Sequence, residues 1–140
     1  MRIFFTPLLF LLFNSCVSEN TELNSFETQL TGKELYAKYC ASCHMENGEG
    51  IAGFYAPLKN SDYMLNDINR TIKTVLYGAN APIMVNELSY PGSIMTRFDH
   101  LSDDDIASIT TYILNAWGNN GGNVTSQIVT KNREIGDKKI

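Results

Sequence analysis

The sequence predicts an all-α domain in which three main helices, joined by long loops, wrap around something large and apolar. Three observations lead to this expectation. Apolar residues recur at helical spacing in three segments. The segments between them are rich in Gly, Pro and Asn and lack the alternation of a strand long enough for a sheet. Three helices alone enclose only a small core, and loops of this length in a compact domain usually serve a function.

The helices are placed by the residues that begin and end them. The first begins at Thr31, because Glu34 follows three positions later and the two can form a capping box. The second covers about residues 67–77, with apolar residues at helical spacing and a glycine at its end. The third begins at Ser102, where three aspartates in the first turn favour the positive end of the helix dipole. Its expected apolar stripe consists of Ile106, Ile109, Ile113 and Trp117.

The chain of 140 residues divides into four parts. Residues 1–16 are predicted to be a signal peptide that ends like a lipobox, and residues 17–29 a polar tether. Residues 30–119 form the expected folded domain, and residues 120–140 a tail that can form a short helix after its glycine pair. The composition, 44% hydrophobic and 19% charged, fits one globular domain.

The first 16 residues have the features of an export signal. Arg2 supplies positive charge, and the apolar run over residues 3–13 is about half as long as the roughly 20 residues that span a bilayer. The run ends in "FNSC", which resembles the lipobox of bacterial lipoproteins, with the small Ser15 before Cys16. We therefore expect export, lipidation of Cys16 and a membrane anchor on the periplasmic side of a bacterial membrane. The alternative is an ordinary signal peptide with an incidental cysteine.

The charge balance argues against a nucleic-acid partner. Lys and Arg number 11 against 15 Asp and Glu, a formal net charge of −4, whereas nucleic-acid-binding domains carry basic patches. The acidic balance instead favours a partner of complementary charge, whose encounter would depend on ionic strength.

The stretch "YCASCH" carries the chemistry, with Cys40 and Cys43 three positions apart and His44 beside the second. A structural zinc site needs four ligands, usually as two separated pairs, and elsewhere the chain offers only His100 and Cys16. A thioredoxin-type pair needs its attacking thiol at a helix N-terminus, whereas these cysteines come at the end of the first helix. The remaining and favoured interpretation is the C-x-x-C-H attachment site of a c-type haem.

In that interpretation each residue has a separate role. Cys40 and Cys43 form thioether bonds to the two vinyl groups of one haem c, and their spacing on a helical turn suits the separation of those groups. His44, held next to the second thioether, ligates the iron from one face.

Residues from about 30 to 119 resemble a class I c-type cytochrome. The stretch "GKELYAKYCASCHMENGEG" is similar to that family's first helix and haem site, and "FYAPL" to the loop that follows. "MTRFDHLSDDDIASITTYILNAWGN" is similar to the segment of the distal ligand and the final helix. The resemblance implies a cytochrome c fold in which the first and last helices cross. The residues expected at the crossing are Gly32, Tyr36, Ile113 and Trp117.

The resemblance also implies the other groups around the iron. Met95 matches the family position of the sixth ligand, while Met84 in the same loop and His100 before the last helix remain alternatives. A proline carbonyl in this family accepts the Nδ1–H of the ligating histidine, which assigns that role toward His44 to Pro57.

With His44 and Met95 on the iron there is no open coordination site, so we expect a one-electron carrier and no catalytic residue. The resemblance implies redox partners such as a dehydrogenase, an oxidase or a reductase. Two alternatives remain open. One is a haem-based sensor or peroxidase-like enzyme from which Met95 dissociates to admit a small ligand, and the other is an electron-transfer subunit of a larger oxidoreductase.

Overall fold

The computed structural model describes residues 1, 29–91 and 94–136. The predicted signal peptide, its lipidation site Cys16 and the polar tether lie outside the described residues, apart from the end residues Met1 and Gln29. Within the described ranges, every helix is too short or too polar to cross a membrane.

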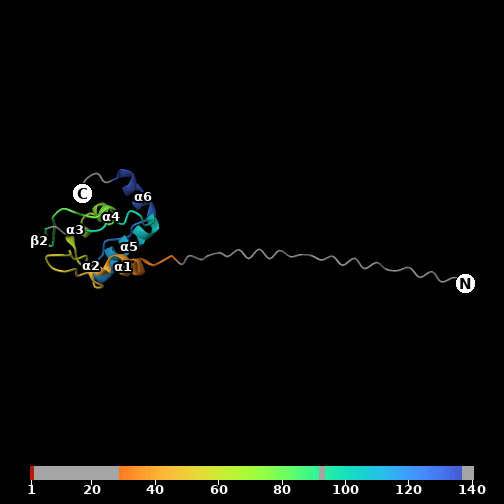
Figure 1. Ribbon diagram of the computed structural model, residues 1–140, viewed down its shortest axis with the longest axis horizontal. Helices are drawn as coiled ribbons and strands as arrows, with labels where there is room; N and C mark the ends of the chain where they lie inside the picture. Colours follow the sequence, from red (N-terminus) through yellow and green to blue (C-terminus); the bar gives the residue numbers. More distant parts are fainter. Residues whose placement is uncertain (2–28, 92–93, 137–140) are drawn as a thin grey trace.

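The described chain is mainly helical, which confirms the all-α prediction (Figure 1). The helices are α1 (Gly32–Tyr39), α2 (Ala41–His44), α3 (Asp62–Leu65), α4 (Ile68–Tyr77), α5 (Asp103–Asn115), the 3-10 turn η1 (Ala116–Gly118) and α6 (Ser126–Ile135). The strands are β1 (Ile83–Val85) and β2 (Leu88–Tyr90).

All three predicted helix starts are confirmed. The hydroxyl of Thr31 accepts from the backbone N–H of Glu34, and the Glu34 carboxylate accepts from the N–H of Thr31 in return, which completes the capping box. Asp67 caps α4 and Ser102 caps α5 in the same local way. These starts are set by contacts within three residues, so the local sequence is sufficient to place them.

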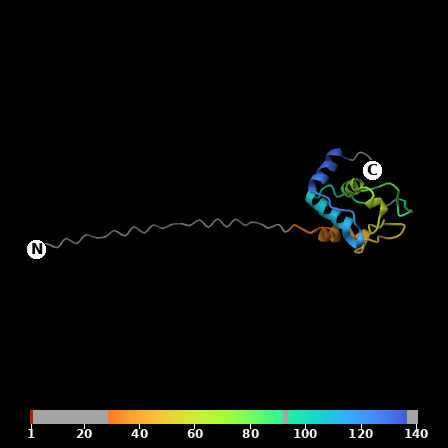
Figure 2. The same ribbon diagram turned by 180° about the vertical axis from the view of Figure 1, so that it is seen from behind.

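The crossing of α1 and α5 is close because one residue in it has no side chain. A Cβ on Gly32 would lie 2.2 Å from the carbonyl oxygen of Ser108 in α5, so only glycine allows this approach. Tyr36 lies in the same crossing, with ring centroids 5.4 Å from Tyr112 and 5.1 Å from Trp117. Both ribbon views show α1 and α5 against each other at one end of the domain (Figures 1 and 2).

The end of α5 differs from the prediction. The helix stops at Asn115, and Trp117 has a left-handed backbone (φ 54°, ψ 25°) instead of continuing the helix. Its indole N–H donates to the carbonyl of Glu46 at 3.0 Å, and its ring packs on the α1 crossing. The expectation that the helix continues through Trp117 is therefore wrong, whereas the expected packing of Trp117 against the core and at the helix crossing is confirmed.

The second long loop contains a hairpin that the sequence analysis does not predict. Strands β1 and β2 pair antiparallel, with Val85 opposite Leu88. Asn86 and Glu87 form the two-residue turn with φ angles of 49° and 66°, the combination that type I′ hairpin turns require. Each strand has three residues, which is too short for a recognisable alternation.

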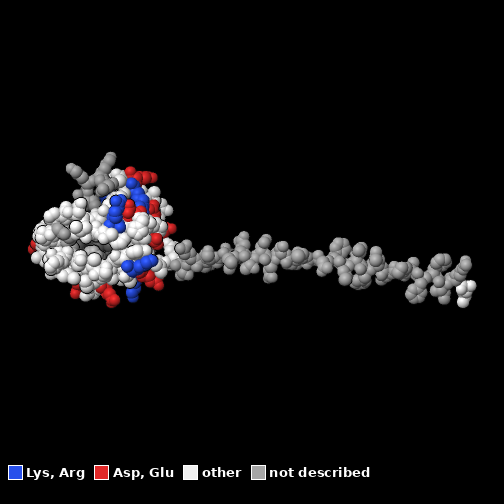
Figure 3. Space-filling model, viewed as in Figure 1, with Lys and Arg blue, Asp and Glu red and all other residues white. Residues whose placement is uncertain are grey.

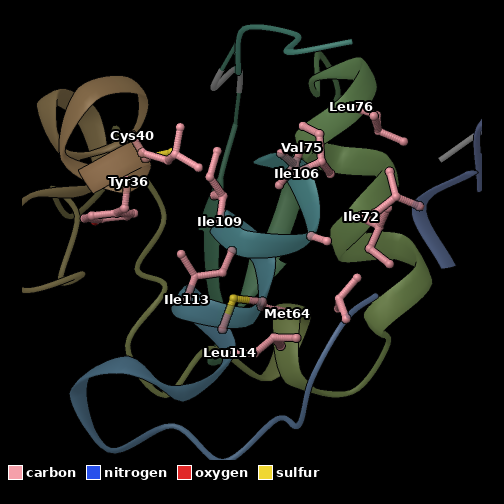
Figure 4. Packing of buried hydrophobic residues seen from close by; sticks show 14 residues of the cluster. Tyr36, Cys40, Met64, Ile72, Val75, Leu76, Ile106, Ile109, Ile113 and Leu114 are labelled. Carbon is pink, nitrogen blue, oxygen red and sulfur yellow. The ribbon is translucent and has the colours of Figure 1, made fainter. Parts of the chain in front are cut away.

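The tail forms the expected helix, α6, which packs against α4 and α5. Its buried residues are Val129 and Asn132, while Ile128 and Ile135 are exposed. The main core lies between α1, α4 and α5 (Figure 4). Its most deeply buried members include Ile72, Leu76, Ile106, Ile109 and Leu114.

Candidate haem site

A mostly apolar cavity of about 350 Å³ lies between α2, α4, the hairpin and the segment before α5. Cys40, Cys43 and His44 line it, and so does Met95 from a part of the chain about fifty residues away. Of the alternative ligands, neither Met84 nor His100 lines this cavity, and Met84 is 56% exposed. The apolar wall is built from Leu58, Val75, Ile83, Val85, Ile109 and Ile113.

Both cysteines lie on one turn of chain where α1 gives way to α2. Cys40 ends α1 and begins α2, and its carbonyl accepts from the N–H of Cys43 at 3.2 Å and of His44 at 2.9 Å. The two cysteines are not joined in a disulfide bond. Burial, and secondarily the nearby Cys43, raises the pKa of Cys40 to about 12. A thiol–disulfide enzyme needs an attacking thiol with a lowered pKa, and the burial of Cys40 acts in the opposite direction.

His44 is oriented by one hydrogen bond. Its Nδ1 lies 2.8 Å from the carbonyl oxygen of Ala56, and a carbonyl can only accept, so Nδ1 carries the proton. Burial lowers the pKa of His44, and the Ala56 hydrogen bond opposes this only in part. The lowered pKa favours the neutral ring. Nε2 is then left with the lone pair that a metal ligand needs. The sequence analysis assigns the acceptor to Pro57; the structure places it one residue earlier, and Pro57 lines the cavity.

The segment after His44 is held by two aromatic side chains, one from α1 and one from the turn that follows α5. The hydroxyl of Tyr36 donates to the carbonyl of Met45 at 2.5 Å, and burial raises the pKa of Tyr36, so this donor stays protonated. The indole N–H of Trp117, in the turn η1 that follows α5, donates to the carbonyl of Glu46. At Gly48 (φ +70°) a Cβ would lie 2.5 Å from the Trp117 ring, so glycine is required there by both conformation and space.

Asn119 is a positioning residue that the sequence analysis misses. It is only 7% exposed, and its amide nitrogen donates to the carbonyls of Leu58 at 3.0 Å and Ile113 at 2.8 Å. Its amide oxygen accepts from the N–H of Asn60 at 2.7 Å. One side chain thus joins the end of α5 to the loop that follows Ala56. An Asn in a Gly- and Asn-rich stretch looks like an ordinary turn residue, so the sequence carries no signal for this role.

The segment that carries Met95 is fixed to the end of α4. Met95 and Ala79 exchange backbone hydrogen bonds of 2.8 and 3.3 Å. A Cβ on Gly78 (φ +76°) would lie 2.3 Å from the Met95 carbonyl oxygen, so this approach needs glycine. Further along, the N–H of Phe98 donates to the α4 carbonyl of Leu76 at 3.1 Å. Phe98 also lines the cavity, with its ring centroid 5.8 Å from that of Tyr39.

The lining residues fit an iron porphyrin. An imidazole nitrogen and a thioether sulfur are iron ligands, and apolar walls suit a large aromatic ring. The hydroxyl of Thr74 also lines the cavity, buried and without a hydrogen-bond partner in the described part of the chain. Such a group is costly unless a polar part of a ligand meets it. The described residues hold no cluster of three His, Cys, Asp or Glu that would suit a bare metal ion.

A small helical fold with C-x-x-C-H on a helix turn and a methionine on the same apolar cavity defines a class I c-type cytochrome. The model of the cytochrome c family matches residues 30–117. This chain therefore belongs to the cytochrome c family.

Relatives fall into two groups. Cytochrome c-552 of Thermus thermophilus is 36% identical over 94 residues, which cover 64% of this chain and 70% of that protein. The cytochrome c subunit of a quinone alcohol dehydrogenase from Gluconobacter oxydans (strain 621H) is 32% identical over 108 residues, 75% of this chain and 22% of the subunit. The fructose dehydrogenase cytochrome subunit of Gluconobacter japonicus is 31% identical over 121 residues, 84% of this chain and 25% of the subunit.

The family confirms two predictions. The chain carries covalently bound haem c, and it transfers electrons. The chain spans about a quarter or less of the two dehydrogenase subunits.

Proposed function

We propose that Cys40 and Cys43 hold the haem through thioether bonds and that His44 and Met95 are the axial ligands of its iron. The observation that carries this proposal is that Met95 lines the same cavity as the C-x-x-C-H residues, whereas Met84 and His100 do not. When bound, the haem iron alternates between Fe(III) and Fe(II) and so carries one electron at a time.

The protein groups have distinct tasks around that iron. The Ala56 carbonyl holds the His44 ring in one tautomer and makes Nε2 a stronger donor. The thioether of Met95 would favour the reduced iron more than a second imidazole would, and so would raise the reduction potential. With His44 and Met95 both on the iron, the haem would exchange electrons without binding a substrate, and its edge beside Cys40 and Cys43 would be the exit route.

The site proposal is tested by replacing each candidate methionine and exposing the reduced protein to carbon monoxide. We expect Met95→Ala to bind carbon monoxide rapidly and stoichiometrically at neutral pH, and Met84→Ala to resist it like the wild type. The matched control removes a methionine of the same loop that is exposed and outside the cavity. Rapid binding by the wild type would instead support the sensor or peroxidase-like alternative.

The partner we propose is an exported dehydrogenase, from which the chain passes electrons toward a terminal oxidase or reductase. The support is that two kinds of relative are by name cytochrome subunits of dehydrogenases. We further propose that Cys16 is lipidated and holds the domain on the periplasmic side of a bacterial membrane, on the strength of the lipobox-like "FNSC".

The charged residues suggest how such a partner approaches. In Figure 3, Lys, Arg, Asp and Glu gather over the part that carries α1, α5 and α6, while the part that carries α3 and β2 is largely uncharged. We propose that the net negative charge steers the approach and that the uncharged part makes the contact. Transfer from a dehydrogenase co-purified from membranes should then slow as ionic strength rises. A rate independent of salt would remove the steering from this proposal.

A further inference from the structure

Helix α6 lies beyond residues 30–117, the part matched by the family model, and its Arg133 reaches the segment before α5. The Arg133 guanidinium donates from Nη1 to the carbonyl of Asp99 at 2.7 Å and from Nη2 to the carbonyl of Leu101 at 2.6 Å. Its Nε donates to the carboxylate of Asp103 at 2.6 Å. Arg133 therefore holds two backbone carbonyls and the first residue of α5 at once.

Those carbonyls belong to the segment that carries Met95. The bridge to Ala79 fixes the start of this segment at Met95, and the backbone of Phe98 ties its middle to α4. Arg133 holds its far end, just before α5 begins. The segment is thus supported along its length, and the last support comes from α6.

The support is rigid enough to matter. The face of α6 beside Arg133 is packed, with Val129 fully buried and Asn132 only 2% exposed. Asn132 donates to the side chain of Asn69 in α4 at 3.1 Å, and Thr130 donates to the same carboxylate of Asp103 that pairs with Arg133. The Arg133 and Asp103 side chains are each only 27% exposed, and charge-assisted hydrogen bonds are stronger when partly shielded from water.

We propose that Arg133 is a positioning residue that keeps Met95 on the haem iron by holding the far end of the segment on which Met95 lies. This inference rests on the proposed coordination by Met95. It adds that the tail helix α6, outside the part matched by the family model, sets how easily that bond opens.

The test uses the purified haem protein and Arg133→Gln. Two readouts report the bond directly: the methionine-to-iron charge-transfer absorption band of the oxidised protein, and the rate of carbon monoxide binding to the reduced protein. Lys131→Gln is the first control, since it removes one positive charge from an exposed position of the same helix. Ile72→Val is the second, since it weakens a fully buried part of α4 outside the cavity.

For Arg133→Gln we expect a weaker band and carbon monoxide binding about tenfold faster. Loss of hydrogen bonds from a charged donor raises the open fraction by about that factor, and the binding rate follows the open fraction. Both controls should keep the wild-type band and rate. Arg133→Lys should lie between, because a single ammonium cannot reproduce the planar fork. If Arg133→Gln gives no folded protein, Arg133→Lys is the variant in which both readouts are measured.

The outcomes separate the two proposals. A wild-type protein without the charge-transfer band would overturn Met95 coordination and this inference with it. A wild-type band that persists in Arg133→Gln and Arg133→Lys, with unchanged carbon monoxide binding, would overturn the role of Arg133 alone. The same is true if Ile72→Val changes both readouts as much as Arg133→Gln, because the effect would then be general destabilisation.

Discussion

Replacing Gly32 by alanine tests whether the close approach of α1 to α5 holds the domain together. The new Cβ would lie 2.2 Å from the Ser108 carbonyl oxygen, 2.8 Å from its carbonyl carbon and 3.0 Å from the Cβ of Tyr112. Two of these atoms are backbone of a helix, so they cannot turn aside as the end of a flexible side chain can. The two helices must separate by about 1 Å before ordinary contact distances return.

The magnitude follows from two opposing terms. Alanine in place of glycine inside a helix gains up to about 1 kcal/mol in propensity, and less at the first helical position, where Gly32 lies. Overpacking of a well-filled contact costs about 1–3 kcal/mol. The same crossing buries Leu35 and Tyr36, so a separation there also exposes apolar area. We therefore expect Gly32→Ala to lower the free energy of unfolding by about 1–2 kcal/mol.

The assay is denaturant or thermal unfolding of the haem protein, followed by far-ultraviolet circular dichroism. For a domain of about 100 residues, each kcal/mol corresponds to a Tm change of roughly 4–8 °C. Ala37→Gly at an exposed position of α1 is the control, because it measures the propensity term without the contact. If Gly32→Ala left the stability unchanged or raised it while Ala37→Gly lowered it, the crossing would not be as close as described.

Two further predictions concern acid stability and haem attachment. The hydrogen bond from Thr130, and then the hydrogen bond and charge of Arg133, hold the pKa of Asp103 below its ordinary value. The stabilisation by the Asp103 carboxylate is therefore complete above the unfolded pKa of about 3.9 and is lost as pH falls through the folded pKa. The free energies of unfolding of the wild type and Asp103→Asn should then converge in acid. A constant difference between these two free energies down to pH ~2 would contradict this. For haem attachment, the wild type and Cys43→Ala should keep their haem through acid–acetone extraction, because at least one thioether bond remains. The double variant Cys40→Ala/Cys43→Ala should release its haem. Release of haem from the wild type would refute the covalent link.

Part of this structure can be predicted from short stretches of sequence. The three main helices begin where Thr31, Asp67 and Ser102 predict, because each cap is a contact within three residues. The haem-attachment motif can be predicted for the same reason, since Cys40, Cys43 and His44 lie close together on one turn of chain. Gly32 was expected at the helix crossing through the family resemblance, and the structure supplies the reason in the Ser108 carbonyl.

Other features depend on contacts between distant parts of the chain. The sequence predicts a helix through Trp117, but the helix ends at Asn115 and the Trp117 side chain bonds to Glu46, 71 positions away. The His44 acceptor is Ala56 and not Pro57, because the path of the intervening loop, which no local pattern encodes, decides which carbonyl reaches the ring.

The sequence by itself therefore determined the fold class, the helix starts and the haem-attachment motif, since these depend on neighbours within a few residues. Only the tertiary structure decided which methionine lines the same cavity as His44. It also decided that Asn119 holds the loop after Ala56 and that Arg133 holds the segment after Met95. The physical reason is that a hydrogen bond from a side chain to a distant carbonyl depends on how the helices pack. The sequence shows an Asn or Arg in the same way whether its side chain is exposed to water or forms hydrogen bonds to a distant loop.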